Sequence, residues 1–284
     1  MSLSLSASVL AAETGALSRS GKPPRFAVFP RLCVALLMLS TAAHAQDQSD
    51  EGPSVTPYRP SVSTPAALSA PGYLEFEAGG QREYEANLRT DSVPYSVKLG
   101  FTPDWGVRIT GNAWLHQRDD SGQSLSGFGD TSVIFKRRFA VNDTSDFGME
   151  AGVTFPTARS GLGDDKADAT LTGIYSADIG ALHTDMNLEW THVGAVDPGV
   201  SHSQILWAAS LSRSFLERWG VVGEFSGTQQ HGLDNTSQFL LAASYNVSKT
   251  LVLDAGFAHS LRHGNSDHSI FAGLTVLGPR LFTP

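Results

Sequence analysis

Histidines and serines gather in two segments whose spacing could support chemistry. His259, His263 and His268 could bind a metal ion, but the further ligand type that zinc usually requires does not accompany them. Ser201-His202-Ser203 could supply the nucleophile and base of a hydrolase, which would also need a third polar group to orient the histidine. Loop residues without a catalytic role are the simpler interpretation of both segments.

Acidic residues form a third candidate in Gly161-Leu162-Gly163-Asp164-Asp165, which Asp168 follows. Oxygen ligands in a glycine-rich loop suit calcium, but the ordered acidic spacing of a dedicated calcium loop is missing. A surface cation, or an ion that bridges lipopolysaccharide, is the alternative to a plain loop. We expect no metal site, no cofactor and no catalytic residue, and therefore a protein that is not an enzyme.

The elements that would position these residues are strands. From Tyr73 to Leu277 apolar and polar side chains alternate in stretches of roughly ten residues, a length that spans a membrane as a tilted strand. The twelve expected strands are 73–79, 93–101, 106–116, 128–139, 147–155, 168–178, 184–193, 203–213, 219–229, 237–247, 251–260 and 268–276. In 106–116, Ile109 and Leu115 share one face, and Arg108 and Trp114 share the other.

This pattern predicts an all-β fold, a transmembrane antiparallel up-and-down β-barrel of about 12 strands. Short connections alternate with long ones, among them 81–92 and 117–127, so short turns should lie at the periplasmic end and long loops outside the cell. A soluble β-sandwich also alternates along its strands, but it has shorter strands and less regular connections.

The expected lumen face carries charges of both signs. Its members are Glu75, Glu77, Lys98, Arg108, Lys136, Arg138, Glu150, Glu189, Glu224 and Asp254. They could form a structural network of pairs, because an unpaired charge away from water is costly, or they could line a selective passage for a solute. The side chains on the opposite, lipid-facing side of the strands include almost no charged residues. The exception is Arg137, which we expect near the periplasmic interface among Phe101, Trp105, Phe139, Phe147, Trp219 and Tyr245.

The N-terminal part of the chain reads as a targeting segment followed by a leader. Basic residues precede an apolar run that ends at Leu39, and Ala43-His44-Ala45 follows, which predicts a signal peptide over residues 1–45. Residues 46–72 are rich in proline and serine, and we expect a disordered periplasmic leader there, or alternatively a segment that folds into the lumen as a partial plug. The barrel would then occupy residues 73–284.

Composition limits the partners of the mature chain. Removal of residues 1–45 leaves 16 basic and 27 acidic residues, a formal charge of −11, which disfavours nucleic acid as a partner. The same cleavage removes the only cysteine, Cys33, so the barrel cannot depend on disulfides.

The segment Gly129-Asp130-Thr131-Ser132-Val133-Ile134-Phe135-Lys136-Arg137-Arg138, with Phe155-Pro156-Thr157 and the glycines at 161 and 163, resembles the outer-membrane family named for the meta-pathway of phenol degradation. Ala158 stands where that family carries glycine. The resemblance implies a transporter-like barrel whose members are often encoded near aromatic catabolism. It assigns no role to single residues, but from their position we expect Gly129 and Asp130 to shape the extracellular entry of the fourth strand, where Asp130 would accept backbone hydrogen bonds.

Together these observations predict a monomeric channel in the outer membrane of a Gram-negative bacterium. Its partners would be outer-membrane lipid and a small solute, for example an aromatic or otherwise hydrophobic one, that passes without energy input. A structural or adhesive barrel is the main alternative, and an outer-membrane lipid hydrolase is the other.

Overall fold

The computed structural model describes residues 52–261 and 267–283, and every regular element within them is a β-strand. The expected signal peptide with Cys33, residues 46–51 of the leader, and His263 lie outside the described residues. The strands are β1 (Tyr73–Glu85), β2 (Leu88–Gly100), β3 (Trp105–Asp119), β4 (Ser124–Gly127), β5 (Thr131–Asn142), β6 (Ser145–Phe155), β7 (Asp168–Ile179), β8 (Leu182–His192), β9 (Ser203–Phe215), β10 (Trp219–Gln230), β11 (Gln238–Ser248), β12 (Leu251–Ser260) and β13 (His268–Arg280).

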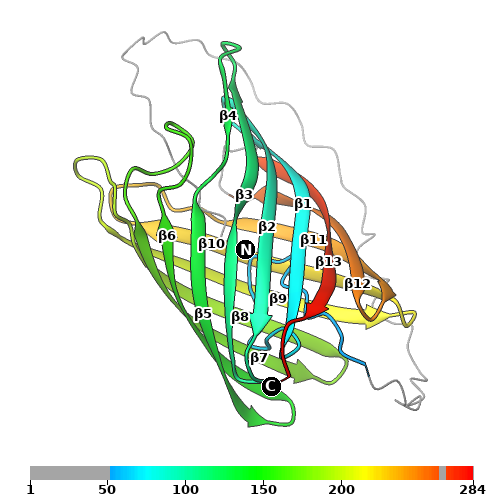
Figure 1. Ribbon diagram of the computed structural model, residues 1–284. Coiled ribbons are helices and arrows are strands. Elements are labelled where there is room, and N and C mark those ends of the chain that lie inside the picture. Colours follow the sequence, from blue (N-terminus) through cyan, green and yellow to red (C-terminus); the bar gives the residue numbers. More distant parts are fainter. Residues whose placement is uncertain (1–51, 262–266, 284) are drawn as a thin grey trace. The chain divides into compact units, whose positions relative to one another are not determined.

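Twelve of these strands, β1–β3 and β5–β13, form a closed antiparallel wall. Each pairs with its neighbours along the chain, and the ring closes where β1 pairs with β13 (Figure 1). The fold is therefore the predicted up-and-down β-barrel, and closure leaves the wall without a free edge. In the described part of the chain, no helix is long and apolar enough to cross a membrane.

Five tight turns join strands at one end of the wall, which we call the short-turn end. They cover residues 101–104, 143–144, 180–181, 216–218 and 249–250. The longer connections 156–167, 193–202 and 231–237 lie at the other end, the long-loop end. This agrees with the predicted alternation in length.

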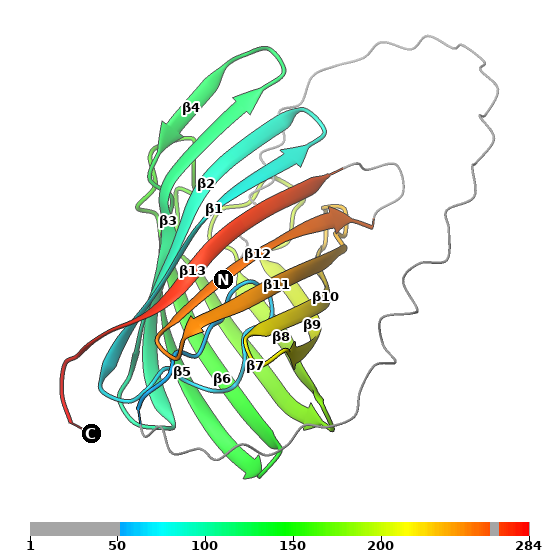
Figure 2. The ribbon, with the colours of Figure 1, turned by 90° about the vertical axis from the view of Figure 1, so that its right-hand side faces the viewer.

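Two of the expected long loops are instead extended hairpins. β1 and β2 continue until only Ala86 and Asn87 separate them, and β3 pairs with the short strand β4 beyond the point where β5 begins. Figure 2 shows these hairpins reaching past the neighbouring strands at the long-loop end. The prediction ended the first strand too early because a polar segment follows Gly79. Its Arg82 pairs with Asp91 across the hairpin, so this polar segment forms strand in water.

A β-bulge in β3 reverses which of the following side chains face the lumen and which face outward, in the part of the strand nearer the long-loop end. Val93 pairs with Trp114 but Pro94 pairs with Asn112, so one extra residue enters β3 opposite the proline. Trp114 is consequently exposed on the outside and Leu115 is buried inside, the opposite of the prediction. Proline has no backbone N–H for the ladder, which makes this a favourable place for a bulge.

The outer face of the wall is apolar. Exposed outward side chains include Phe76, Phe135, Val153, Leu171, Leu188, Phe225, Leu241, Phe257 and Ile270. A contiguous apolar band of this kind on a closed barrel is suited to lipid. Near the short-turn end it meets exposed aromatic residues at Trp105, Phe139, Phe147 and Trp219, as predicted for an inner girdle.

Arg137 lies in this girdle. It pairs across the sheet with Trp105 and Met149, and its guanidinium carbon is 4.5 Å from the centre of the Trp105 ring and 4.8 Å from that of Phe139. A cation held between two rings at the depth of the interface can reach lipid headgroups and water. Arg137 therefore lies near the short-turn end among two of the aromatic residues with which the sequence groups it.

An arginine deeper on the same face should be far more costly. Ala151 lies two residues along β6 from Met149, at the centre of the exposed positions between Phe147 and Phe155. We expect A151R to lower the free energy of unfolding by about 2–4 kcal/mol, and M149R, in the row of Arg137, by about 1 kcal/mol or less. Urea unfolding in lipid vesicles, followed by tryptophan fluorescence, measures both. Equal losses for the two variants would contradict the assigned membrane depth.

Candidate functional site: an occupied lumen

The ten charged residues predicted on the inner face all belong to the barrel wall. Eight of them are buried: Glu75, Glu77, Lys98, Arg108, Lys136, Glu150, Glu224 and Asp254. Arg138 and Glu189 are half-buried, and Arg138 pairs with Asp146 at 2.8 Å near the short-turn end. Such deep burial in a barrel that could hold water requires something else inside the lumen.

The occupant is the chain's own leader. Residues 55–71, which we call the plug, enter the lumen at the short-turn end, where the Val55 N–H donates to the Lys249 carbonyl at 3.0 Å. They leave at the same end, where Pro71 bridges to Gly100 just before β1. Side chains of seven wall strands contact the plug by hydrogen bonds: β1, β2, β5, β7, β8, β10 and β12.

Residues 55–71 thus take the alternative that the sequence leaves open, a segment folded into the lumen, and not that of a disordered periplasmic leader. Prolines and small polar residues cannot form a hydrophobic core by themselves, which is why this composition favours disorder in an isolated segment. In the barrel the same composition is an advantage, because small side chains fit a narrow lumen and the backbone polar groups find charged partners on the wall. Ser63, Thr64, Ala66 and Ser69 of the plug are buried there.

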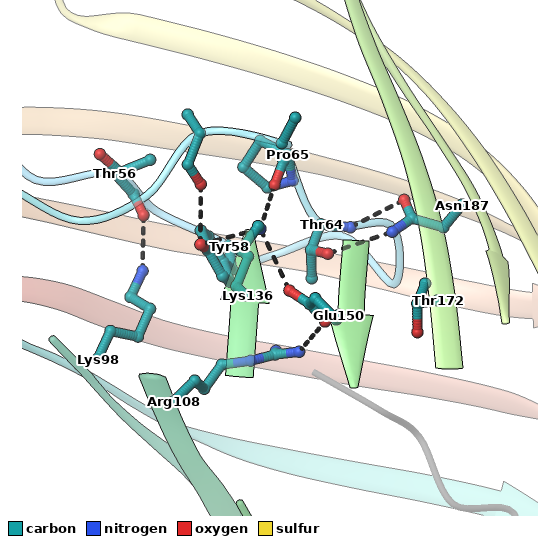
Figure 3. Close-up of polar contacts among 12 residues, drawn as sticks. Thr56, Tyr58, Thr64, Pro65, Lys98, Arg108, Lys136, Glu150, Thr172 and Asn187 are labelled. Carbon is teal, nitrogen blue, oxygen red and sulfur yellow. Dashed lines mark hydrogen bonds and ion pairs between the residues drawn. The ribbon is translucent and has the colours of Figure 1, made fainter. Parts of the chain in front are cut away.

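A compact cluster of six wall charges lies beside the plug on β1, β2, β3, β5 and β6. Lys98 pairs with Glu75 at 2.6 Å and with Glu77 at 2.7 Å. Glu150 pairs with Arg108 at 2.8 Å and with Lys136 at 3.2 Å (Figure 3). Three cations thus balance three carboxylates, which is the condition under which buried charges are tolerated.

The plug adds further partners to this cluster. The backbone N–H groups of Thr56 and Tyr58 donate to Glu75 at 3.0 Å and to Glu77 at 2.7 Å, and Lys98 donates to the Thr56 carbonyl at 2.6 Å. Lys136 donates to the Pro65 carbonyl and, at 3.0 Å, to the Tyr58 hydroxyl (Figure 3). The arrangement is a structural network, in which the plug and the wall satisfy each other's polar groups.

Arg59 connects the plug to the opposite side of the wall. Its guanidinium donates to both carboxylate oxygens of Asp254, at 3.0 and 3.2 Å, and both side chains are almost fully buried. The arginine lies over Gly79 and Gly273, which face each other across β1 and β13. A side chain added at either glycine would collide with it, so these glycines form the groove for Arg59.

Carboxylate, amide and hydroxyl oxygens of the wall accept hydrogen bonds from the rest of the plug. Glu224 accepts hydrogen bonds from the backbone N–H groups of Val62 and Ser63, at 3.0 and 2.8 Å, and from the Ser63 hydroxyl at 2.6 Å. Asn187 accepts from the Thr64 N–H at 3.1 Å, and Ser176 accepts from the Ala66 N–H at 2.8 Å. The plug therefore follows the wall from β12 through β10 and β8 to β7.

Open space remains on the long-loop side of the plug. A cavity of about 110 Å³ lies between Val62, at the top of the plug, and the upper parts of β1 and β9–β13. Its lining includes Glu83, Tyr84, Leu206 and His268. We call this cavity the vestibule, because it lies on the long-loop side of the plug.

The loop residues considered for catalysis make local contacts. The His202 Nδ1 atom bonds the Val193 carbonyl at 2.5 Å, and the Ser201 hydroxyl accepts the Ser203 N–H at 3.0 Å. His259 and His268 are cross-strand neighbours on β12 and β13. Within residues 52–261 and 267–283, no group of three or more histidine, cysteine, aspartate or glutamate side chains is placed to hold a metal ion.

The acidic loop is organised around Asp130. Its carboxylate accepts the N–H groups of Ala158 at 2.9 Å and Asp164 at 3.1 Å, which confirms the predicted role of Asp130 at the entry of its strand. Burial, with repulsion from Asp168, Asp130 and Asp165, raises the pKa of the Asp164 carboxyl. The loop therefore carries closely spaced negative charge that its own hydrogen bonds partly stabilise.

Comparison with solved structures supports the barrel fold. An outer-membrane channel from Pseudomonas putida F1 matches with a TM-score of 0.58 at 12% identity, covering 75% of this chain and 97% of the channel. The NanC porin matches with a TM-score of 0.56 at 10% identity, covering 71% of this chain and 98% of the porin. No protein-family model matches the sequence, and no curated protein matches it significantly. The chain thus has the fold of outer-membrane channel porins.

Proposed function

We propose that this protein is an outer-membrane channel of a Gram-negative bacterium that lets small solutes pass without energy input when the plug shifts. The observation that carries the proposal is a closed barrel with an apolar outer face and a charged inner face. Lipid around the wall and a polar path through it are the two requirements of such a channel. The similar folds of one solved outer-membrane channel and one solved porin support the same class.

The plug can move without unfolding the barrel. Its deep hydrogen bonds join plug groups to wall side chains, whereas in the described part of the chain the backbone–backbone hydrogen bonds between plug and wall lie at its two ends, at Lys249 and Gly100. The wall ladders are complete without it. Release would therefore expose polar groups to water in the lumen, where they can be hydrated, and leave the sheet intact.

The resemblance of residues 129–138 to the phenol-degradation transporter family leads us to assign the chain to that group and to expect small aromatic or hydrophobic solutes. A twelve-stranded wall supports this size range, since eight strands leave room for little but side chains and sixteen leave a wide pore. We place the short-turn end in the periplasm and the long loops outside the cell, and we expect a monomer.

A structural or adhesive barrel is the second candidate, and the filled lumen favours it. Conductance in planar bilayers and solute flux from loaded vesicles distinguish the two candidate functions. The mature wild-type chain should conduct at a level below that of a general porin, and it should admit phenol-sized solutes faster than disaccharides. Absence of both conductance and solute flux in a correctly folded barrel would reject the channel and leave the structural role.

A further inference from the structure

The ring of Tyr58 lies among three wall cations, in what we call the Tyr58 cradle. The ammonium nitrogens of Lys98 and Lys136 are 3.9 and 4.3 Å from the ring centre, and the guanidinium carbon of Arg108 is 5.4 Å away. Each distance is within the range of a cation–π contact. Figure 3 shows Lys98, Arg108 and Lys136 around Tyr58; they belong to β2, β3 and β5.

The hydroxyl of Tyr58 is held as specifically as the ring. It accepts a hydrogen bond from Lys136 at 3.0 Å and donates one to the Ala67 carbonyl of the plug at 2.8 Å. Tyr58 is almost completely buried, with 4% of its surface exposed. The wall supplies the cations and the hydrogen-bond donor, and the plug supplies the acceptor, of a site that fits an aromatic ring with one hydroxyl group.

The charge of the cradle defines which aromatic compounds it can accept. Glu75, Glu77 and Glu150 already neutralise the three cations, so the cradle has no net formal charge. An anionic ring would compete with these carboxylates for the same cations, and a cationic ring would be repelled at the ring face. An uncharged ring is attracted through its π face without disturbing the ion pairs.

We propose that the Tyr58 cradle is a recognition site for uncharged phenols, and that Tyr58 occupies it as an internal competitor for the solute. This inference rests on the proposed channel function and names the solute class of the same lumen. The three cations belong to β2, β3 and β5, whereas Tyr58 and the Ala67 carbonyl belong to the plug, so the ring-binding part of the site and the Lys136 donor stay on the wall when the plug moves. A phenol that reached the cradle from the vestibule would replace the contacts that Tyr58 makes.

The Y58A variant of the full mature chain tests this directly, because it removes the competitor and leaves a cavity the size of the lost side chain. Phenol should bind Y58A about ten-fold more tightly than cyclohexanol, which has the same hydroxyl and similar size but no π face. Benzylamine, cationic at pH 7, should show no saturable binding. Thermal unfolding in detergent and ligand-observed NMR give the affinities, and a variant that refolds poorly can be compared by its refolding yield with each compound.

Matched variants separate the cradle from unspecific binding. Y58F retains the ring and should not bind phenol, and Y58A/K98M should lose most of the preference for phenol over cyclohexanol. Equal affinity for phenol and cyclohexanol, or phenol binding that persists in Y58F, would overturn the proposal. The conductance of the wild-type chain is measured separately, without added solute. If the chain conducts but Y58A shows no preference for phenol, the recognition site is wrong and the proposed channel function stands.

Discussion

Replacement of Arg59 by alanine should raise the conductance of the barrel strongly. The substitution leaves Asp254 buried without its guanidinium partner, and breaking a buried pair in this way typically costs about 3–5 kcal/mol. The plug is not a strand of the β-sheet. We therefore expect the lost free energy to destabilise the plug in the lumen and to leave the stability of the barrel wall unchanged. The population with a displaced plug should therefore increase by two orders of magnitude or more, about 100-fold at the lower limit.

Single-channel recording of R59A beside R82A measures this effect. Arg82 also pairs with an aspartate, Asp91, but it lies on the exposed hairpin and its side chain is 44% exposed. Loss of an exposed pair is worth less than about 1 kcal/mol, so R82A should conduct like the wild type. If R59A conducted no more than R82A, the Arg59–Asp254 pair would not hold the lumen closed.

The barrel was predictable because its signals are local. Alternation along each strand assigns one face to lipid and the other to the lumen, and the ten lumen candidates lie on the inner side of the wall. The position of Arg137 near the aromatic girdle could be predicted from free energy, since an arginine on the lipid face is tolerated only near the membrane interface.

The errors of prediction arise from long-range pairing. The β1–β2 hairpin continues through a polar segment because Arg82 and Asp91 meet across the strands, and alternation along one strand contains no sign of that pairing. The bulge opposite Pro94 changes the phase of Trp114 and Leu115 by one residue, which a period-two pattern cannot anticipate. Both features depend on the partner strand.

The position of the plug was the least predictable feature. Its partners on the wall are as many as 195 residues away in sequence, as for Arg59 and Asp254, and its composition is that of a disordered segment. One signal was present in the strands themselves. Gly79, Gly148 and Gly273 interrupt the alternation where the plug approaches the wall, and glycine inside a strand indicates a close approach of another group.

A disulfide between plug and wall tests most directly the central claim that solutes pass only when the plug moves. A β-carbon built at Gly148 lies 3.3 Å from the β-carbon of Ala66, close to the separation in disulfides, and a chain that begins at residue 46 contains no native cysteine to interfere. We would introduce A66C and G148C together into the R59A background and record conductance before and after reduction. We expect oxidation to abolish the raised conductance of R59A and reduction to restore it, with each single-cysteine variant insensitive to both. Equal conductance in the oxidised and reduced states, with the disulfide shown to be formed, would contradict it.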